Sequence, residues 1–421
     1  MLSLNRTLHI ERLGPRGEGL APGPDGEIAA PYALPGETIV AEVDGRRARL
    51  VEVTAPSRDR IAPICRLFGA CGGCAVQTLR HDAYVRWKEG LLADALRRAG
   101  LAAPREPLLD AHGQGRRRAT FHVRATPAGL QVGFMTARSH EIVDVDACPI
   151  LAPGLADAPR AAHVIARQLA AGGKPLDILV TQTLDGLDVD LRGHGPLNED
   201  ETRRLVAAAL RLDLARLSNH GVVVAQARAP RVRHGEIDAA IAPGAFLQAT
   251  QAGEDALTGE AVAALRNARR VADLFCGGGA FSLRLARFSS VRALDYEEAP
   301  LKALASAARE NGLRAVKVEA RDLFRRPLSA QELSEFDGLV FDPPRAGALE
   351  QARAVAASQI PVVVAVSCNA ETFARDAAIL TAGGYEIEKI LPVDQFRYSP
   401  HLEIVARFRR RRKKKARRLL G

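Results

Sequence analysis

Between about residues 246 and 408, short apolar runs alternate with helical patterns, and this alternation narrowly limits the fold. Five runs have the length and branched side chains of buried strands: Val271–Phe275, Val291–Asp295, Val316–Glu319, Gly338–Phe341 and Pro361–Val366. Strands that alternate with helices predict a Rossmann-like, doubly wound parallel sheet of the α/β class. Glu386–Pro392 and His401–Phe408 follow with no helix between them, so the sheet should finish with an antiparallel terminal strand.

A glycine-rich loop, DLFCGGGAFS from Asp273 to Ser282, follows the first of these strands. Ligands of a doubly wound sheet bind at the carboxyl ends of the strands, where this loop should lie. The dinucleotide pattern GxGxxG is not met, because Ser282 stands where the third glycine would be. The loop and the antiparallel end are together typical of class I methyltransferases. Their methyl donor, S-adenosylmethionine (SAM), carries no pyrophosphate.

We expect four positions around this loop to contact SAM. Phe275 and Gly277 belong to the loop itself, where glycines let a ligand approach the backbone closely. Asp295 ends the second strand, and an acid there can accept both ribose hydroxyls. The alternative for Asp295 is a cap on the next helix. Asp322 follows the third strand and is placed to contact the adenine.

Three further reactive side chains follow or begin the later strands. Asp342 opens DPPRAG after the fourth strand, Cys368 lies in SCN after the fifth, and Glu403 begins the last. These strands should be neighbours, so the three side chains should face one cavity. A thiolate that adds to C6 of uracil makes C5 nucleophilic, and acidic groups can stabilise the enolate or remove the C5 proton. The set suits that reaction. Cys368 could instead be a buried structural thiol, and the rival Cys276 is interpreted as packing within the loop.

A base inside folded RNA must be flipped out before such chemistry can reach it. The segment PGAFLQAT, residues 243–250, directly precedes the catalytic region. Phe246 is a candidate to stack on the base, and Gln248 is a candidate to read the uracil edge. Either side chain could instead belong to the core or to a helix cap.

Four cysteines form a set of metal-ligand type: Cys65, Cys71, Cys74 and Cys148. Four thiolates suit either zinc or an iron-sulfur cluster. The five-residue gap after Cys65 and the Cys148–Pro149 ending favour a 4Fe-4S cluster. The methylation chemistry needs no electron, so the cluster should be structural or should position the RNA.

The 421 residues hold 59 Lys and Arg against 49 Asp and Glu, but Arg407–Arg418 alone holds ten of the basic residues. The rest of the chain is therefore close to neutral. The basic tail should contact a polyanion such as RNA, unless it is only a solvated terminus. No apolar run approaches the ~18 residues of a membrane span, and charges interrupt the first residues. We therefore expect a cytoplasmic protein with no membrane partner.

Four segments divide the chain. Residues 1–58 carry short strands and turns that predict an OB-like β-barrel, a shape that often binds oligonucleotides, although it can be purely structural. Residues 59–245 mix helical and strand patterns around the cysteine loop and predict a central α+β domain. Residues 246–408 form the catalytic domain, and residues 409–421 form the basic tail.

The chain resembles the bacterial RNA (uracil-5-)-methyltransferase family over nearly its whole length. The motifs that carry the resemblance are LPGE (34–37), CRLFGACGGC (65–74), IVDVDACP (142–149), FLQAT (246–250), DLFCGGGAFSL (273–283), DPPRAGA (342–348), VSCN (366–369) and HLEIVA (401–406). The resemblance implies a nucleophile at Cys368 and a general base at Glu403. It places SAM and base contacts at Gln248, Asp295 and Asp342. Its cluster ligands fall on Cys65, Cys71, Cys74 and Cys148.

The N-terminal barrel resembles a TRAM domain, an RNA-binding module. A TRAM domain together with cluster cysteines is similar to the 23S rRNA branch (RumA/RlmD type), which implies 23S rRNA as substrate for a monomeric enzyme. The chain departs from the family pattern at Thr250, at Asp295 and over residues 396–400. The alternatives are a tRNA uracil-5-methyltransferase with the same chemistry and a non-catalytic RNA-binding assembly factor. A cytosine-5-methyltransferase is disfavoured by DPPR and SCN.

Overall fold

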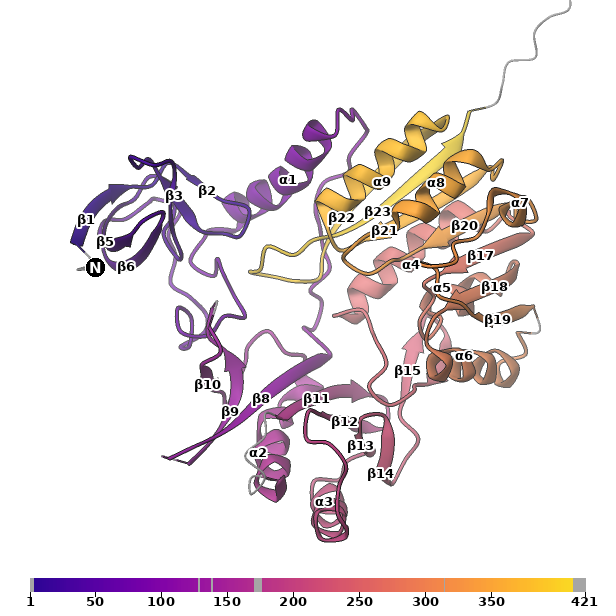
Figure 1. Ribbon diagram of the computed structural model, residues 1–421, viewed down its shortest axis with the longest axis horizontal. Helices are drawn as coiled ribbons and strands as arrows, with labels where there is room; N and C mark the ends of the chain where they lie inside the picture. The colour runs from indigo at the N-terminus through magenta and orange to yellow at the C-terminus, as the bar shows by residue number, and fades with distance from the viewer. Residues whose placement is uncertain (1–3, 128, 138, 170–175, 314, 412–421) are drawn as a thin grey trace, which may run out of the picture.

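A computed structural model describes residues 4–127, 129–137, 139–169, 176–313 and 315–411. Figure 1 shows three parts, with the N-terminal strands on the left, a second sheet below and the C-terminal sheet with its helices on the right. The residues beyond Arg411, which include most of the predicted basic tail, lie outside the described residues. Among the residues described, no helix is long and apolar enough to cross a membrane.

The N-terminal sheet has six strands in the order β1-β5-β6-β4-β3-β2. They are β1 (Leu4–His9), β2 (Arg12–Leu13), β3 (Gly19–Ala21), β4 (Ile28–Ala30), β5 (Thr38–Asp44) and β6 (Arg47–Ala55). Buried and less buried side chains alternate along β5, so that one face of this barrel-like sheet packs around Ile10, Ile28 and Ile39. Between β1 and β2 the strand is interrupted at Ile10, because the backbone of Ile10 pairs with Gly36 and Glu37 instead.

The middle sheet has seven strands in the order β10-β9-β8-β11-β12-β13-β14. They are β8 (Arg118–Thr126), β9 (Gly129–Met135), β10 (Ile142–Asp144), β11 (Leu176–Thr183), β12 (Gly186–Arg192), β13 (Arg216–Asn219) and β14 (Val222–Gln226). The short helix η1 (Pro153–Leu155) and the helices α2 (Ala158–Leu169) and α3 (Glu199–Arg211) pack against it. A two-stranded hairpin, β15 (Arg231–His234) and β16 (Ile237–Ala240), leads to the C-terminal part.

The C-terminal sheet confirms the predicted α/β fold, with the strand order β19-β18-β17-β20-β21-β23-β22-β7. Its strands are β7 (Leu109–Asp110), β17 (Arg270–Leu274), β18 (Ser290–Asp295), β19 (Val316–Ala320), β20 (Gly338–Phe341), β21 (Val362–Ser367), β22 (Tyr385–Asp394) and β23 (Glu403–Arg410). The first five in this order run parallel, and β23 lies antiparallel beside β21 as predicted. The last strand continues to Arg410, two residues beyond the predicted end of the catalytic domain at residue 408.

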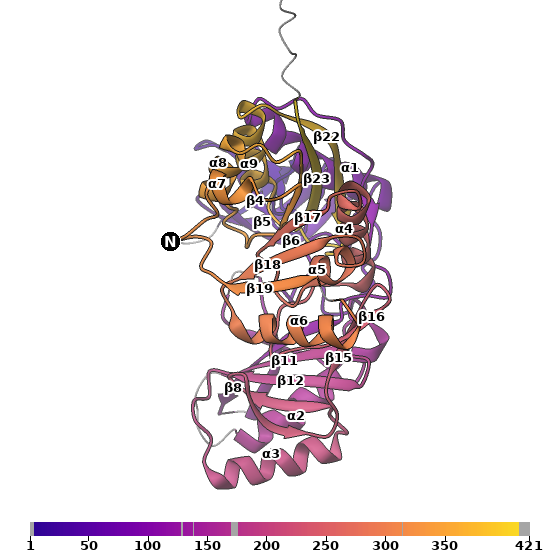
Figure 2. The ribbon, with the colours of Figure 1, turned by 90° about the vertical axis from the view of Figure 1, so that its right-hand side faces the viewer.

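Helices cover both faces of this sheet (Figure 2). They are α4 (Gln251–Leu265), α5 (Ala280–Leu285), α6 (Glu298–Glu310), α7 (Ala330–Leu333), α8 (Leu349–Ala357) and α9 (Ala370–Ala382). One apolar core joins α4, α5 and α6 to one face, and a second joins α8 and α9 to the other. Two layers of helix around parallel strands leave the carboxyl strand ends as the open edge of the fold.

An element from the first quarter of the chain completes the C-terminal sheet. Helix α1 (His81–Arg98) packs against α9, and its Leu92 and Leu96 enter the same core. After it, β7 pairs with the end of β22. Inside this contact the Lys88 Nζ lies 2.8 Å from Asp394 Oδ1, and the Tyr84 hydroxyl donates to Asp394 Oδ2 at 2.5 Å. The sequence does not indicate where this helix packs.

Replacing Lys88 by methionine should destabilise the protein by about 3–5 kcal/mol, because it leaves the buried Asp394 carboxylate without its cation. Both side chains are almost fully buried, at 0% and 3% exposure. Chemical unfolding would measure the loss. Lys302→Met is the matched control, since its ion pair with Glu298 is exposed and should contribute less than about 1 kcal/mol. Equal losses in the free energy of unfolding for the two variants would contradict the conclusion that Lys88 stabilises the buried Asp394 carboxylate.

Candidate active site

The glycine-rich loop turns sharply between β17 and α5. Phe275, Gly277 and Gly279 all adopt positive φ angles, of 60°, 51° and 89°. Such a conformation strains a non-glycine residue, and strain of this kind gathers at ligand sites. A Cβ on Gly279 would lie 2.3 Å from Leu304 Cδ1, whereas a Cβ on Gly277 would meet nothing within 4 Å. The loop is therefore packed tightly on the helix side and open on the other.

Two of the predicted SAM contacts are carboxylates that differ in their surroundings. Asp295 ends β18, and its Oδ2 accepts a hydrogen bond of 2.8 Å from the backbone of Gly277, so it is bound to the loop. Its other oxygen accepts from the backbone of Glu297 at 3.1 Å. Asp322 instead accepts from the backbone of Phe324 and Arg325 at 3.0 and 3.1 Å. Asp295 therefore contacts the glycine-rich loop, whereas the hydrogen bonds of Asp322 close a turn.

A cavity of about 70 Å³ lies between this loop and the segment before α4. Its walls include Phe275 and Gly277 from the loop, Phe246 and Gln248 from the preceding segment, and Asp342 from the end of β20. The ring of Phe275 lies 5.4 Å from that of Phe324. Four of the predicted contact residues and one predicted catalytic residue therefore share one cavity.

Two glutamines connect the predicted catalytic carboxylates. Gln248 Nε2 donates to Asp342 Oδ2 at 2.9 Å, and Gln248 Oε1 accepts from Gln395 Nε2 at 2.7 Å. Gln395 in turn interacts with the Glu403 carboxylate at the start of β23. Gln248, Gln395 and Glu403 are all at most 5% exposed. The partly buried Asp342 and the buried Gln248, Gln395 and Glu403 thus form one polar chain across the ends of β20, β22 and β23.

Burial shifts the acids of this site toward their protonated forms. Burial raises the pKa of Asp342 to about 7, although the hydrogen bond from Gln248 acts in the opposite direction. Burial and then the charge of Asp342 raise the pKa of Glu403 well above its ordinary value. Burial likewise raises the pKa of Asp273 to about 7 despite a 2.6 Å hydrogen bond from Ser282. Two close carboxylates that cannot both ionise easily can hold and release a proton together.

Cys368 lies in the turn between β21 and α9, and this turn is closely held. The neighbouring Ser367 and Asn369 bond to each other across it, and Asn369 caps α9 by accepting from Glu371 at 3.0 Å. Burial, then the charges of Glu403 and Asp342, raise the pKa of the Cys368 thiol to about 11, and Arg345 acts in the opposite direction. The three predicted catalytic side chains therefore lie near one another, although only Asp342 of the three lines one of the cavities described here. Cys276 is buried in a hydrophobic core, in keeping with the packing interpretation.

Phe246 projects from this site. Its side chain is 66% exposed, which is unusual for a phenylalanine, and it borders both the small cavity and a larger neighbouring one. The backbone of the segment that carries Phe246 is held by Arg117, whose Nε donates a hydrogen bond of 3.0 Å to the Gln248 carbonyl. Arg117 also pairs with the buried Glu254 at 2.5 Å. An exposed ring on an anchored backbone is a suitable platform for a base.

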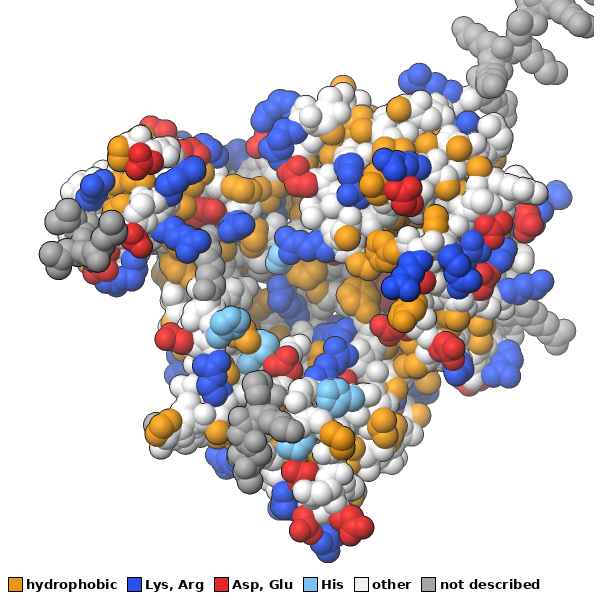
Figure 3. All heavy atoms as spheres, viewed as in Figure 1, with side chains coloured by type: hydrophobic (Ala, Val, Ile, Leu, Met, Phe, Trp, Pro, Cys, Tyr) orange, Lys and Arg blue, Asp and Glu red, His pale blue; other side chains and the backbone are white. Residues whose placement is uncertain are grey.

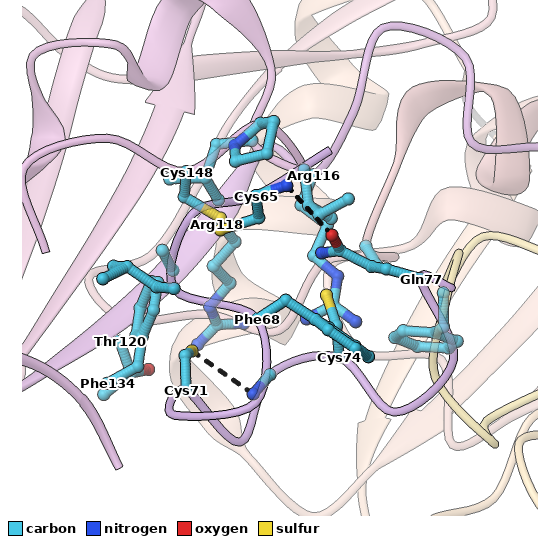
Figure 4. A pocket seen from close by; sticks show the side chains of 18 of the residues that line it. Cys65, Phe68, Cys71, Cys74, Gln77, Arg116, Arg118, Thr120, Phe134 and Cys148 are labelled. Carbon is cyan, nitrogen blue, oxygen red and sulfur yellow. Dashed lines mark hydrogen bonds between the residues drawn. The ribbon is translucent and has the colours of Figure 1, made fainter. Parts of the chain in front are cut away.

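The four predicted ligand cysteines line one cavity of about 500 Å³ (Figure 4). The loop that carries three of them is attached to the middle sheet, where the Gly72 N–H donates to the Met135 carbonyl at 2.9 Å. Burial raises the pKa of Cys74 to about 11. Among the described residues, no three Cys, His, Asp or Glu side chains are close enough together to hold a single metal ion. The described residues thus place the four cysteines around one cavity but show no metal-binding group.

A third and wider hollow, about 970 Å³, separates the N-terminal sheet, the cysteine loop and the active-site edge. Figure 3 shows Lys and Arg side chains along the hollow between these parts. Four arginines line it: Arg16, Arg49, Arg116 and Arg345. His401, just before β23, opens onto the same hollow.

Three participants in the site are absent from the sequence predictions. Gln395 carries no motif signal, because its role depends on the two side chains it bridges. Arg116 and Arg117 belong to the run GRRRAT, which is a possible signal, since three arginines at the start of a strand need partners. The structure supplies one for Arg117 and places Arg116 between two cavities.

Comparison with known proteins agrees with this geometry. The sequence profile of the tRNA (uracil-5-)-methyltransferase family matches residues 231–411. An uncharacterized RNA methyltransferase of Agrobacterium fabrum is 42% identical, over 95% of this chain and 98% of that protein. The 23S rRNA (uracil(1939)-C(5))-methyltransferase RlmD of Chromohalobacter salexigens is 34% identical, over 94% of this chain and 87% of that protein.

The fold itself has a solved counterpart. The crystal structure of the Pyrococcus abyssi tRNA (uracil-54, C5)-methyltransferase with S-adenosyl-L-homocysteine superposes with a TM-score of 0.72 at 21% identity, and covers 96% of this chain and all of that one. Similarity over nearly the full length, together with the shared fold, settles the family. The chain is a member of the uracil-5 RNA methyltransferase family.

Proposed function

We propose that this protein transfers a methyl group from SAM to C5 of one uridine in 23S rRNA through a covalent Cys368 adduct. The observation that carries the proposal is the polar chain from Asp342 through two glutamines to Glu403, beside Cys368 and the open glycine loop. The choice of 23S rRNA rests on the full-length relative from Chromohalobacter salexigens. The specific uridine would be set by the RNA surface around the site.

The reaction begins with the thiol. Cys368 gives its proton to the Asp342–Glu403 pair, and its sulfur bonds to C6 of the flipped uracil. The electron pair of the C5–C6 double bond moves toward O4, which makes C5 a nucleophile. C5 then takes the methyl group from the sulfonium of bound SAM, and a neutral thioether remains. The open backbone at Gly277 and the carboxylate of Asp295 would hold the donor for this step.

The second half restores the aromatic base. Glu403, as a carboxylate, removes the proton from C5, the C5–C6 double bond forms again and the C6–S bond breaks. The released thiolate regains a proton from the pair, so that one proton leaves to solvent in each turnover. Asp342 is held by Gln248, and the two can present a donor and an acceptor to the uracil edge.

Phe246→Ala should raise the KM for RNA about 5- to 100-fold while kcat at saturating RNA changes little, because stacking on an aromatic ring contributes about 1–3 kcal/mol per base. Initial rates over a range of RNA concentrations would measure the two constants separately. Phe288→Ala is the matched control, because this ring is also exposed, at 55%, but lines none of the cavities of the site. An unchanged KM for Phe246→Ala would remove this residue from the base site.

We also propose that the four cysteines bind a 4Fe-4S cluster. What supports the proposal is that all four thiols line one cavity of about 500 Å³, although the described residues form no metal-binding group. Since the methyl transfer needs no electron, the cluster would hold the cysteine loop against the middle sheet. Anaerobically purified protein should show the broad visible absorption of iron-sulfur centres, with iron and sulfide in equal amounts. A colourless protein that contains zinc would refute the cluster.

The N-terminal sheet is proposed to bind RNA as a TRAM-like module. Its arginines Arg16 and Arg49 face the wide hollow that leads to Arg345 and the active-site edge. A strand of RNA laid along this hollow would meet positive charge before its base reaches Phe246. Electrostatic contacts of this kind position the nucleic acid and make binding depend on salt.

The direct test is methylation of unmodified RNA. The protein is incubated with SAM and either 23S rRNA or tRNA, and methylated nucleosides are mapped by mass spectrometry. 5-Methyluridine at one site of the rRNA is the expected result. Methylation of tRNA alone would keep the mechanism and overturn the substrate. Methylation of neither RNA would favour an RNA-binding assembly factor.

A further inference from the structure

Arg116 is a partly buried cation without a carboxylate partner among the described residues. It stands just before β8, and its backbone is fixed by hydrogen bonds of 2.8 Å to Ile150 and from Ala152. Among the described residues, no acid forms an ion pair with its guanidinium, and the buried Nε has no hydrogen-bond partner. Its guanidinium lies over the ring of Phe396, whose centroid is 5.3 Å away. A charge removed from water in this way is costly unless something compensates it.

The groups nearest to Arg116 belong to the cysteine cavity. Figure 4 shows its guanidinium beside Cys74, and both side chains line the same cavity with Cys148. The acidic groups whose charges act on it are Cys74 and Cys148, followed by Asp394 and Tyr84. Asp394 is already paired with Lys88 and bonded to Tyr84. The unsatisfied cation therefore faces two of the four cysteines.

We infer that Arg116 is the counter-cation of the group bound by the four cysteines, and sets its stability and reduction potential. This inference rests on the proposed iron-sulfur cluster. Four thiolates bring more negative charge than an iron-sulfide core neutralises, and hydrogen bonds and nearby charge are main determinants of cluster potential. The guanidinium offers both, because its N–H groups can donate to a ligand sulfur while its charge lowers the free energy of adding an electron.

The same side chain connects the cluster to the catalytic edge. Phe396, on which Arg116 stacks, directly follows Gln395, the residue that bridges Gln248 and Glu403. The cysteine loop reaches this segment independently, since the Ala75 and Val76 N–H groups both donate to the Tyr398 carbonyl, at 2.7 and 3.2 Å. Arg116 is therefore a positioning residue, and loss of the cluster should disturb the Gln395 segment.

An RNA phosphate is the competing partner, because Arg116 also borders the wide hollow. Arg345 lines that hollow too, but it is exposed to solvent, whereas Arg116 is turned toward the cysteines. A phosphate contact would change the affinity for RNA and its salt dependence. A cluster contact would change the spectroscopic and redox properties of the free protein. The two can be measured separately.

The experiment compares wild type, Arg116→Gln, Arg116→Lys and Arg66→Gln, each purified anaerobically as the full chain. Redox titration with dithionite, followed by absorption and paramagnetic resonance, gives the midpoint potential, and exposure to air gives the rate of bleaching. Arg116→Gln should shift the potential to more negative values and bleach several-fold faster. Arg116→Lys, which keeps the charge, should recover part of both. Arg66→Gln removes a charge beside Cys65, but that side chain is 71% exposed and paired with Asp146, so neither property should change.

A cluster in Arg116→Gln with the potential and bleaching rate of wild type would overturn the inference. So would an unchanged potential together with weaker RNA binding and a shallower salt dependence, because Arg116 would then be a phosphate ligand. If wild type itself bound no cluster, the proposed cluster would fail, a result distinct from either. Should Arg116→Gln not fold, the lysine variant decides: a small negative shift of the potential with faster bleaching than Arg66→Gln would support the inference, and a potential and bleaching rate equal to those of Arg66→Gln would overturn it.

Discussion

Replacing Cys368 by serine should reduce methyl transfer by at least about a thousandfold, because a hydroxyl cannot add to C6 of uracil at neutral pH as a thiolate can. The side chain sits at the end of β21, and Glu403 and Asp342 both act on it. Transfer of a labelled methyl group to RNA, followed over time, would measure the loss. SAM binding should be retained, because the glycine loop lies on β17, two strands away from β21.

Calorimetric titration with SAM provides the control for Cys368→Ser. Normal affinity for SAM together with absent turnover would locate the defect at the thiol. Normal turnover would eliminate Cys368 as the nucleophile. Cys276 could not then replace it without exposure of a core position, since it is only 6% exposed within its hydrophobic cluster.

Glu403→Gln should slow turnover by roughly 10²- to 10⁴-fold and at the same time accumulate a covalent protein–RNA adduct. The amide can preserve the contact with Gln395 but cannot remove the C5 proton, so the C6–S bond stays intact after methyl transfer. Denaturing gels with labelled RNA would reveal a slowly migrating species that carries both protein and RNA.

The double variant Cys368→Ala/Glu403→Gln separates a true adduct from tight binding. It should form no species that survives denaturation, because no sulfur is present to bond to C6. A Glu403→Gln variant that loses turnover without any adduct would reassign the proton removal to another group, and Asp342, with its pKa raised to about 7, would be the next candidate.

Much of this site follows from sequence because a few rules place the strand ends. Parallel strands that alternate with helices must bring Asp342 and Cys368 to one edge, and an antiparallel last strand must begin there with Glu403. Both rules concern the path of the backbone, and the α/β fold confirms the strand order on which they depend. The adenine contact predicted for Asp322 depends instead on the direction of a side chain. The turn at residues 322–325 engages that carboxylate with backbone N–H groups.

The remaining features depend on contacts between segments far apart in the chain. No periodicity indicates that Lys88 would pair with Asp394, because the two side chains are 306 positions apart and each alone reads as a surface charge. Gln395 and Arg116 are similar cases. The sequence does not show the roles of these two residues, because their roles depend on the side chains that surround them in the folded protein.

The pairing of β7 with β22 implies that the methyltransferase sheet cannot be separated as an autonomous module. Cutting the chain after the middle sheet would remove an edge strand and the helix that covers part of the core, and would leave Asp394 buried without a cation. Recombination that exchanges the RNA-binding half for another would therefore have to carry α1 and β7 along. The segment from His81 to Asp110 would therefore be inherited together with the catalytic half of the chain. In the sequence, the cysteine loop separates this segment from the N-terminal barrel.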